Sequence, residues 1–102
     1  MRKIIKGKMY DTETATEVGS FSNAGSFRDF THMEETLYRK RNGEFFLFGE
    51  GGPMTKYAVT IGQNSWSGGS RITPLTENQA REWAEECLNV DEYISLFGDV
   101  DE

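Results

Sequence analysis

Residues 34–50, EETLYRKRNGEFFLFGE, consist of two strand-like runs joined by Asn42-Gly43. Asn and Gly both tolerate positive φ, and the type I′ turn that they favour matches the twist of two antiparallel strands. We therefore predict a β-hairpin here, with Asn42-Gly43 as its two-residue loop. Counting outward from that loop gives the cross-strand pairs Arg41–Glu44, Lys40–Phe45, Arg39–Phe46, Tyr38–Leu47 and Leu37–Phe48.

The run Phe45–Phe48 is apolar at every position. Because successive side chains of a strand point to opposite faces, both faces of this strand are apolar. A strand with one solvated face alternates between apolar and polar residues, so we interpret this run as a central strand covered on both sides. The predicted register divides the hairpin into one face with Tyr38, Phe45 and Leu47 and another with Leu37, Phe46 and Phe48.

A helix is predicted to begin after Thr76, because Thr76 and Gln79 have the spacing of a capping box. Apolar side chains then recur at i, i+3, i+4, i+7 and i+8, forming a stripe of Ala80, Trp83, Ala84, Cys87 and Leu88. The opposite face of this amphipathic helix carries Glu82, Glu85 and Glu86. A second short helix is predicted over residues 90–97, ending at Gly98.

Three further segments are predicted to be strands: residues 2–10, with a turn at Lys6-Gly7, residues 15–21, and residues 71–75, where Pro74 indicates a sheet edge. In the loop after residue 21, Phe27 and Phe30 are expected to fold back into the core. Residues 53–70 fit two descriptions between which the sequence does not decide. One is a helical turn over residues 54–58, and the other is a strand in which residues 57, 59 and 61 alternate as apolar positions.

Together these elements predict an α+β fold in a single domain of residues 1–102. Its antiparallel sheet has four or five strands and is centred on the hairpin at 34–50. The helix that follows Thr76 covers one face of the sheet, and the N-terminal strands with residues 53–70 cover the other. Hydrophobic residues make up 36% of the chain, a fraction that argues against disorder.

The charge of the chain is unevenly distributed. The net charge is −6, but residues 76–102 hold nine acids and one base, Arg81. This C-terminal region is therefore an acidic pole with a net charge of −8, whereas residues 1–75 carry +2. The bases gather in two places, Arg2-Lys3-Lys6-Lys8 and Arg39-Lys40-Arg41.

Motifs that carry catalytic or metal chemistry do not occur in this sequence. One cysteine, Cys87, and one histidine, His32, are too few for most metal sites and catalytic triads. The glycines at 49–52 match neither a P-loop nor a dinucleotide-binding pattern. We therefore expect no enzymatic activity, no catalytic residue, no cofactor, no metal and no small-molecule substrate. No apolar run is long enough to span a membrane, and no signal peptide follows Met1, so a cytoplasmic location is expected.

Trp66 has few apolar neighbours in the sequence, since Asn, Ser and Gly flank it. It either packs back onto the sheet or stands exposed as an anchor for a partner. The same choice between structure and binding applies to the basic residues, which either solubilise edge strands or contact phosphates.

Three blocks of the sequence, MRKIIKGKMYDTETA, EETLYRKRNGEFFLFGEGGPMTKY and NSWSGGSRITPLTENQAREWAEE, resemble a family of small acidic proteins of mobile elements. These proteins are encoded on plasmids, phages and conjugative elements of Firmicutes, and the resemblance spans nearly the whole chain. Some members are anti-CRISPR proteins directed against type II-A Cas9. The resemblance implies a mobile-element protein that acts inside a bacterial host cell, and it supplies no catalytic residues.

The function expected from this resemblance is non-enzymatic inhibition of type II-A Cas9, by binding that blocks assembly of Cas9 with its guide RNA. Cas9 holds nucleic acid in a positively charged channel, which an acidic helical pole can occupy. The expected partner-binding residues are Glu82, Glu85 and Glu86, with Trp66 as an anchor. Two alternatives remain: the bases at 2–8 and at Arg39, Lys40 and Arg41 bind RNA or DNA directly, or the chain is a protein-interaction module of a mobile element unrelated to Cas9.

Overall fold

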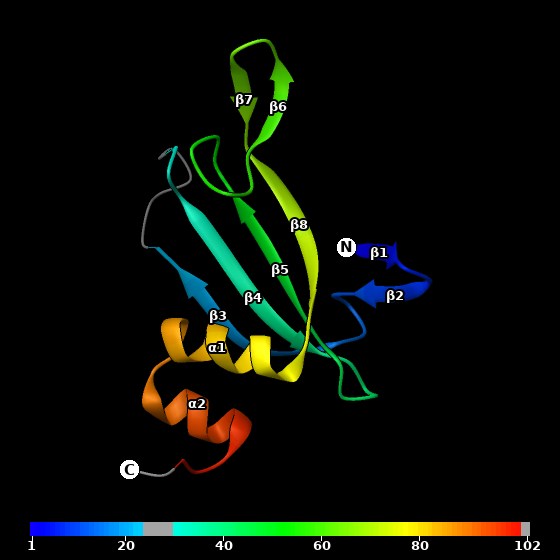
Figure 1. Cartoon of the computed structure of the whole chain (residues 1–102), viewed down its shortest axis with the longest axis vertical. Coiled ribbons are helices and arrows are strands. Elements are labelled where there is room, and N and C mark those ends of the chain that lie inside the picture. Colours follow the sequence, from blue (N-terminus) through cyan, green and yellow to red (C-terminus); the bar gives the residue numbers. More distant parts are fainter. Residues whose placement is uncertain (24–29, 101–102) are drawn as a thin grey trace.

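The computed structural model describes residues 1–23 and 30–100, which form an α+β fold (Figure 1). Its main sheet is antiparallel and has four strands in the order β3-β4-β5-β8. These strands are β3 (Thr16–Ser22), β4 (Met33–Arg39), β5 (Phe45–Gly51) and β8 (Gly69–Leu75). Two separate two-stranded sheets pair β1 (Arg2–Ile5) with β2 (Lys8–Asp11) and β6 (Val59–Gly62) with β7 (Ser65–Ser67). The helices are α1 (Glu77–Cys87) and α2 (Val90–Phe97).

The central hairpin is β4-β5, but the predicted register is wrong by one residue. Leu37 pairs with Leu47 rather than with Phe48. The backbone N–H of Lys40 donates to the carbonyl of Glu44 at 2.8 Å, so the loop is one residue longer than predicted. A type I′ turn needs positive φ at both central residues, and here only Gly43 has it, at 90°. The same Asn-Gly pair instead forms a turn closed by Gly43 N–H donating to the Lys40 carbonyl, with Gly43 in the left-handed region.

This shift exchanges the faces predicted for Leu37 and Tyr38. Leu37 lies with Phe45 and Leu47, and these three pack with Ala80 of α1. Tyr38 packs instead with Phe46, whose ring it stacks at a centroid distance of 5.2 Å. The interpretation of β5 as an inner strand covered on both faces is confirmed, because Phe45, Phe46 and Leu47 are all buried.

The helices cover one face of the main sheet, as predicted. Thr76 is the N-cap of α1 and forms the predicted capping box with Gln79. Asn89 caps α2 in the same way with Glu92, which satisfies backbone N–H groups at a second helix start. Along α1, Ala80 and Ala84 are fully buried, whereas Trp83 is partly buried against the same cluster.

The other face is covered by the N-terminal hairpin β1-β2, whose Lys6-Gly7 turn has positive φ at both residues. Tyr10 of this hairpin is buried and meets the ring of Phe46 edge-on at 5.5 Å. The prediction that residues 53–70 help to cover this same face is wrong for Tyr57. Its ring lies against Gly49, on the face that carries α1, since a Cβ at Gly49 would collide with the Tyr57 ring.

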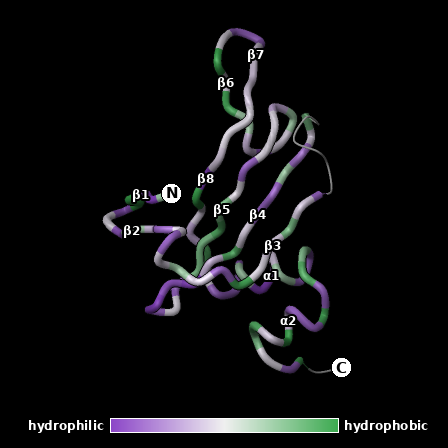
Figure 2. The backbone as a smooth tube through the Cα atoms, turned by 180° about the vertical axis from the view of Figure 1, so that it is seen from behind, coloured by the Kyte–Doolittle hydropathy of each residue, from purple (hydrophilic) through white to green (hydrophobic). Residues whose placement is uncertain are grey.

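Residues 53–70 contain a turn followed by the hairpin β6-β7, which extends beyond the end of the main sheet remote from the helices (Figure 1). Seen from behind, this extension combines apolar residues on β6 with more polar ones on β7 (Figure 2). Phe30 is 64% exposed, so the prediction that it returns to the core is wrong, and Phe27 lies outside the described residues. Pro74 is in the edge strand β8, as predicted. None of the helices in the described ranges is both long and apolar enough to cross a membrane.

Candidate functional site

The outer face of α1 presents a row of exposed carboxylates. Glu82, Glu85 and Glu86 are all exposed, and none of them forms an ion pair with a residue in the described ranges. The one base of this helix, Arg81, lies 3.8 Å from Glu77 and over the ring of Phe97 at 4.7 Å. The charge of Arg81 therefore pairs with Glu77 and leaves Glu82, Glu85 and Glu86 available to a partner.

A buried carboxylate ties α1 to the sheet. Glu35 of β4 is only 3% exposed, and one of its oxygens accepts a hydrogen bond from Trp83 Nε1 of α1 at 3.1 Å. The other oxygen accepts from the Tyr57 hydroxyl and lies 2.7 Å from Lys56 Nζ. This cluster of Glu35, Lys56, Tyr57 and Trp83, the Glu35 network, joins three parts of the chain that are far apart in sequence.

The Glu35 network holds its carboxylate in the charged form. Burial by itself would raise the pKa of Glu35, but the hydrogen bonds from Lys56, Tyr57 and Trp83 outweigh it and lower the pKa. Burial and the neighbouring Glu35 carboxylate raise the pKa of Tyr57, so this hydroxyl remains a donor. We infer that the Glu35 network holds α1 in place on the sheet. It thereby also fixes the position of the acidic face of α1. The burial of Glu35 is not predictable from local sequence, because its partners lie 22 and 48 residues away and no local pattern indicates them.

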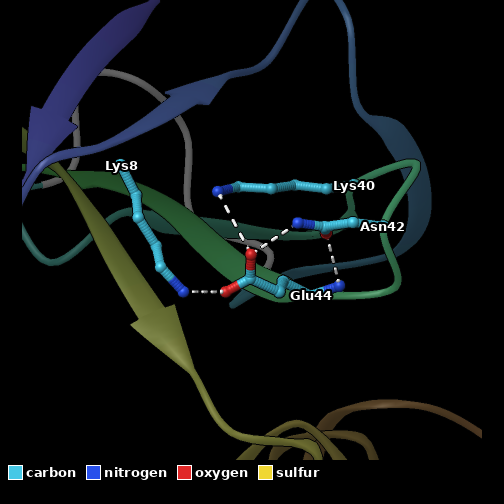
Figure 3. A network of polar contacts seen from close by, with 4 residues as sticks. All are labelled: Lys8, Lys40, Asn42 and Glu44. Carbon is cyan, nitrogen blue, oxygen red and sulfur yellow. Dashed lines mark hydrogen bonds and ion pairs between the residues drawn. The ribbon is translucent and has the colours of Figure 1, made fainter.

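Lys40 of the β4-β5 turn and Lys8 of β2 are engaged within the molecule around Glu44 (Figure 3). Lys40 Nζ lies over the Tyr10 ring at 3.7 Å and 3.9 Å from a Glu44 oxygen. The other Glu44 oxygen accepts from Lys8 Nζ at 2.8 Å, and Asn42 Nδ2 donates to the first at 2.6 Å. These hydrogen bonds lower the pKa of Glu44 and raise that of Lys8. Glu44 therefore offsets one of the two lysine charges and connects β1-β2 to the central hairpin.

The structure does not bring Arg39, Lys40 and Arg41 together as one basic surface. Arg39 is exposed on the helix side, where it lines a hollow with Asp91 and Glu92 of α2. Lys40 turns to the other side of the sheet, onto Tyr10. Arg41 is exposed in the turn itself. Lys40 and Arg41 line one hollow beside the turn, together with Asp11 and Asn42, whereas Arg39 lines a different hollow on the helix side.

Trp66 lies on β7 with 56% of its surface exposed, in the hairpin that extends away from the sheet (Figure 1). Its cross-strand partner is Thr60, so no large apolar side chain covers it from the facing strand. Trp66 therefore does not pack back onto the sheet, and its role as an anchor for a partner stays a prediction. Trp66 is separated from the acidic row by the length of the main sheet, so one small partner surface cannot contact both directly.

The other side chains that could act as nucleophiles or metal ligands, those of Cys87 and His32, are partly or fully buried. Burial raises the pKa of the Cys87 thiol, with Glu35 and Glu86 adding to the shift, so the thiolate needed for nucleophilic chemistry is disfavoured. His32 is buried, and its Nε2 lies 3.6 Å from a Glu34 oxygen. Within residues 1–23 and 30–100, no group of three or more His, Cys, Asp and Glu side chains is placed to hold a metal ion.

Comparison with known proteins identifies no relative of this chain. No protein-family model matches it, and neither a curated protein nor a solved structure does.

Proposed function

We propose that the chain is a non-enzymatic inhibitor that binds type II-A Cas9 and prevents its assembly with guide RNA. The observation that carries this proposal is the outer face of α1, where Glu82, Glu85 and Glu86 are exposed without an ion-pair partner among the described residues. The resemblance of three sequence blocks to the mobile-element family that includes Cas9 inhibitors supplies the identity of the partner.

The mode of action follows from competition for positive charge. Guide RNA and the acidic row both carry closely spaced negative charges. Cas9 binds guide RNA in a positively charged channel, for which the acidic row would compete. A helix mounted rigidly through Glu35 and Trp83 presents its carboxylates without first having to become ordered, which lowers the entropic cost of binding. Because the attraction is between exposed charges, inhibition weakens as the salt concentration rises.

The internal use of the lysines argues against direct binding of nucleic acid as the main activity. Glu44 pairs with Lys8 and Lys40 and offsets one of their two charges, and the chain as a whole carries a net charge of −6. A phosphate backbone would therefore meet a molecule of net negative charge, in which the exposed bases include Arg39 and Arg41 at the turn and a group on the β1-β2 hairpin that contains Lys3 and Lys6. This alternative makes a different prediction for guide RNA in the absence of Cas9.

The test incubates the protein with apo Cas9 before labelled guide RNA is added, for a panel of type II-A Cas9 orthologues. We expect loss of guide loading and of target cleavage for at least one orthologue, and recovery of both when the guide is loaded first. A control omits Cas9, since a direct nucleic-acid binder shifts the labelled guide by itself. Normal loading and cleavage at saturating protein for every orthologue would contradict the proposal.

A further inference from the structure

An apolar groove with a volume of about 300 Å³ lies where α1 and α2 meet. Leu88, Tyr93 and Ile94 contribute partly buried side chains to it. Val90 and Val100 line it while remaining 71% and 57% exposed. Single exposed valines are ordinary on protein surfaces, but two of them on the same groove as three larger apolar side chains form a continuous apolar surface.

Acidic residues lie on and near one side of this groove. Glu85 lines it directly, and Glu82 lies one helical turn earlier on the same side of α1. Asp99 is exposed next to Val100. None of the described residues that line the groove is Lys or Arg, so its charge is of one sign. An occupant that fits must combine apolar side chains with positive charge.

We propose that the groove between α1 and α2 binds a basic amphipathic helix of the protein partner. Apolar residues at i and i+3 or i+4 of that helix contact Leu88, Tyr93 and Ile94, and its Lys or Arg residues pair with the acidic residues on that side of the groove. The volume is at the lower limit of the ~300–1,000 Å³ of ligand pockets, which fits a few inserted side chains better than a small molecule. This inference rests on the proposed function and specifies which element of the partner is bound.

The first test uses a labelled synthetic peptide of about 14 residues, roughly four helical turns, built from Leu, Ala and Lys with an apolar stripe. A peptide of the same composition in scrambled order has the same charge without the stripe. We expect the amphipathic peptide to bind at least about tenfold more tightly, measured by fluorescence anisotropy. Equal affinity for the two peptides would show that only charge is recognised, and would overturn the inference.

The second test locates the peptide with two matched variants of α2. Val90→Lys places a positive charge in the groove, whereas Ser95→Lys adds the same charge at an exposed position of α2 that does not line it. We expect Val90→Lys to weaken peptide binding about tenfold and Ser95→Lys to change it less than about twofold. Val100→Lys, beyond the end of α2, provides a second groove variant should the first alter the helix. Equal weakening by groove and control variants would contradict the proposed location.

A second copy of this chain is the competing occupant. Sedimentation of the wild-type protein without peptide tests it, and a dimer that Val90→Lys dissociates would overturn the inference. Failure of the groove is distinguishable from failure of the proposed function. If the Val90→Lys protein inhibits guide loading as well as wild type does, the groove is not used although Cas9 is the target. If wild type binds the peptide but inhibits no Cas9 orthologue, the groove stands and Cas9 is not the partner.

Discussion

The acidic face of α1 and the basic turn of β4-β5 each display three charges of one sign in the sequence, yet the fold treats them differently. On α1, Glu82, Glu85 and Glu86 are exposed side by side. At the turn, only the flanking arginines remain exposed, since Lys40 is held over Tyr10 and beside Glu44. A run of like charges in a sequence therefore does not by itself predict a binding surface. Its ability to bind a charged partner depends on how many of those charges already have partners within the fold.

The two regions also differ in how firmly each is fixed to the sheet. The acidic face is mounted by a buried network in which Glu35 and Trp83 meet at 3.1 Å. The basic turn is joined to β1-β2 through exposed contacts of Lys8 and Glu44. Buried hydrogen bonds to a charged group contribute more than exposed ion pairs, so the acidic face is the more rigid of the two.

The largest expected effect on stability comes from removing the side chain that joins α1 to the sheet. Trp83→Ala should lower the free energy of unfolding by about 3–5 kcal/mol, because a large side chain is lost from the core cluster and Glu35 loses a donor. Its control on the same helix, Glu85→Ala, should cost less than about 0.5 kcal/mol, since Glu85 faces solvent. Denaturant midpoints in the reverse order would contradict the assignment of inner and outer faces.

A smaller loss is expected for Glu35→Gln, which keeps the shape of the side chain but removes its charge. The hydrogen bonds from Lys56, Tyr57 and Trp83 become weaker, at a cost of about 1.5–3 kcal/mol near neutral pH. The folded state lowers the pKa of Glu35, so its stabilisation is present above the unfolded carboxyl pKa of about 4.3 and is lost as pH falls through the folded value. The stability difference between wild type and variant should therefore shrink in acid. A difference that stays constant from neutral pH to acid would rule out this role for the Glu35 carboxylate.

Trp66→Ala should leave the free energy of unfolding within about 0.5 kcal/mol of wild type, because the side chain is more than half exposed. On the hypothesis that it anchors a partner, the same change weakens binding to Cas9. Melting temperature and affinity are measured on the same preparation. A fall in melting temperature as large as that of Trp83→Ala would mean that Trp66 is a core residue.

The smallest effect on inhibition is expected from weakening the ion pairs of Lys8 and Lys40 with Glu44. Glu44→Gln removes the negative charge shared by Lys8 and Lys40 and so makes the basic region more available. If the acidic face inhibits Cas9, guide loading in the presence of this variant should match that of Glu13→Gln, which alters net charge equally at an exposed site. Stronger inhibition or new binding to guide RNA by Glu44→Gln alone would favour the basic region instead.

Features with local causes were predicted correctly from the sequence. The capping box of Thr76 and Gln79 and the stripe through Ala80 and Ala84 depend on neighbours within a few residues, and both occur as predicted. The register of the central hairpin was not, because Asn42-Gly43 suits two turn types that differ by one residue in loop length. Distant packing decides between them, and a sequence pattern does not contain it.

The candidate site divides in the same way. That Glu82, Glu85 and Glu86 share one exposed helix face followed from helical periodicity. The burial of Glu35 did not follow from the sequence. Glu35 lies next to Glu34 in a segment that looks polar, and its hydrogen-bond donors come from distant parts of the chain. Phe30 illustrates the converse error, since an aromatic residue in a loop was expected in the core but is exposed.

The most direct test of the central claim compares two triple charge reversals in the guide-loading assay. One changes Glu82, Glu85 and Glu86 to Lys, and the other changes Arg39, Lys40 and Arg41 to Glu, with circular dichroism to establish that both variants are folded. We expect the first to abolish inhibition of guide loading onto Cas9 and the second to retain it. Inhibition that survives reversal of the acidic face and disappears on reversal of the basic turn would contradict the account.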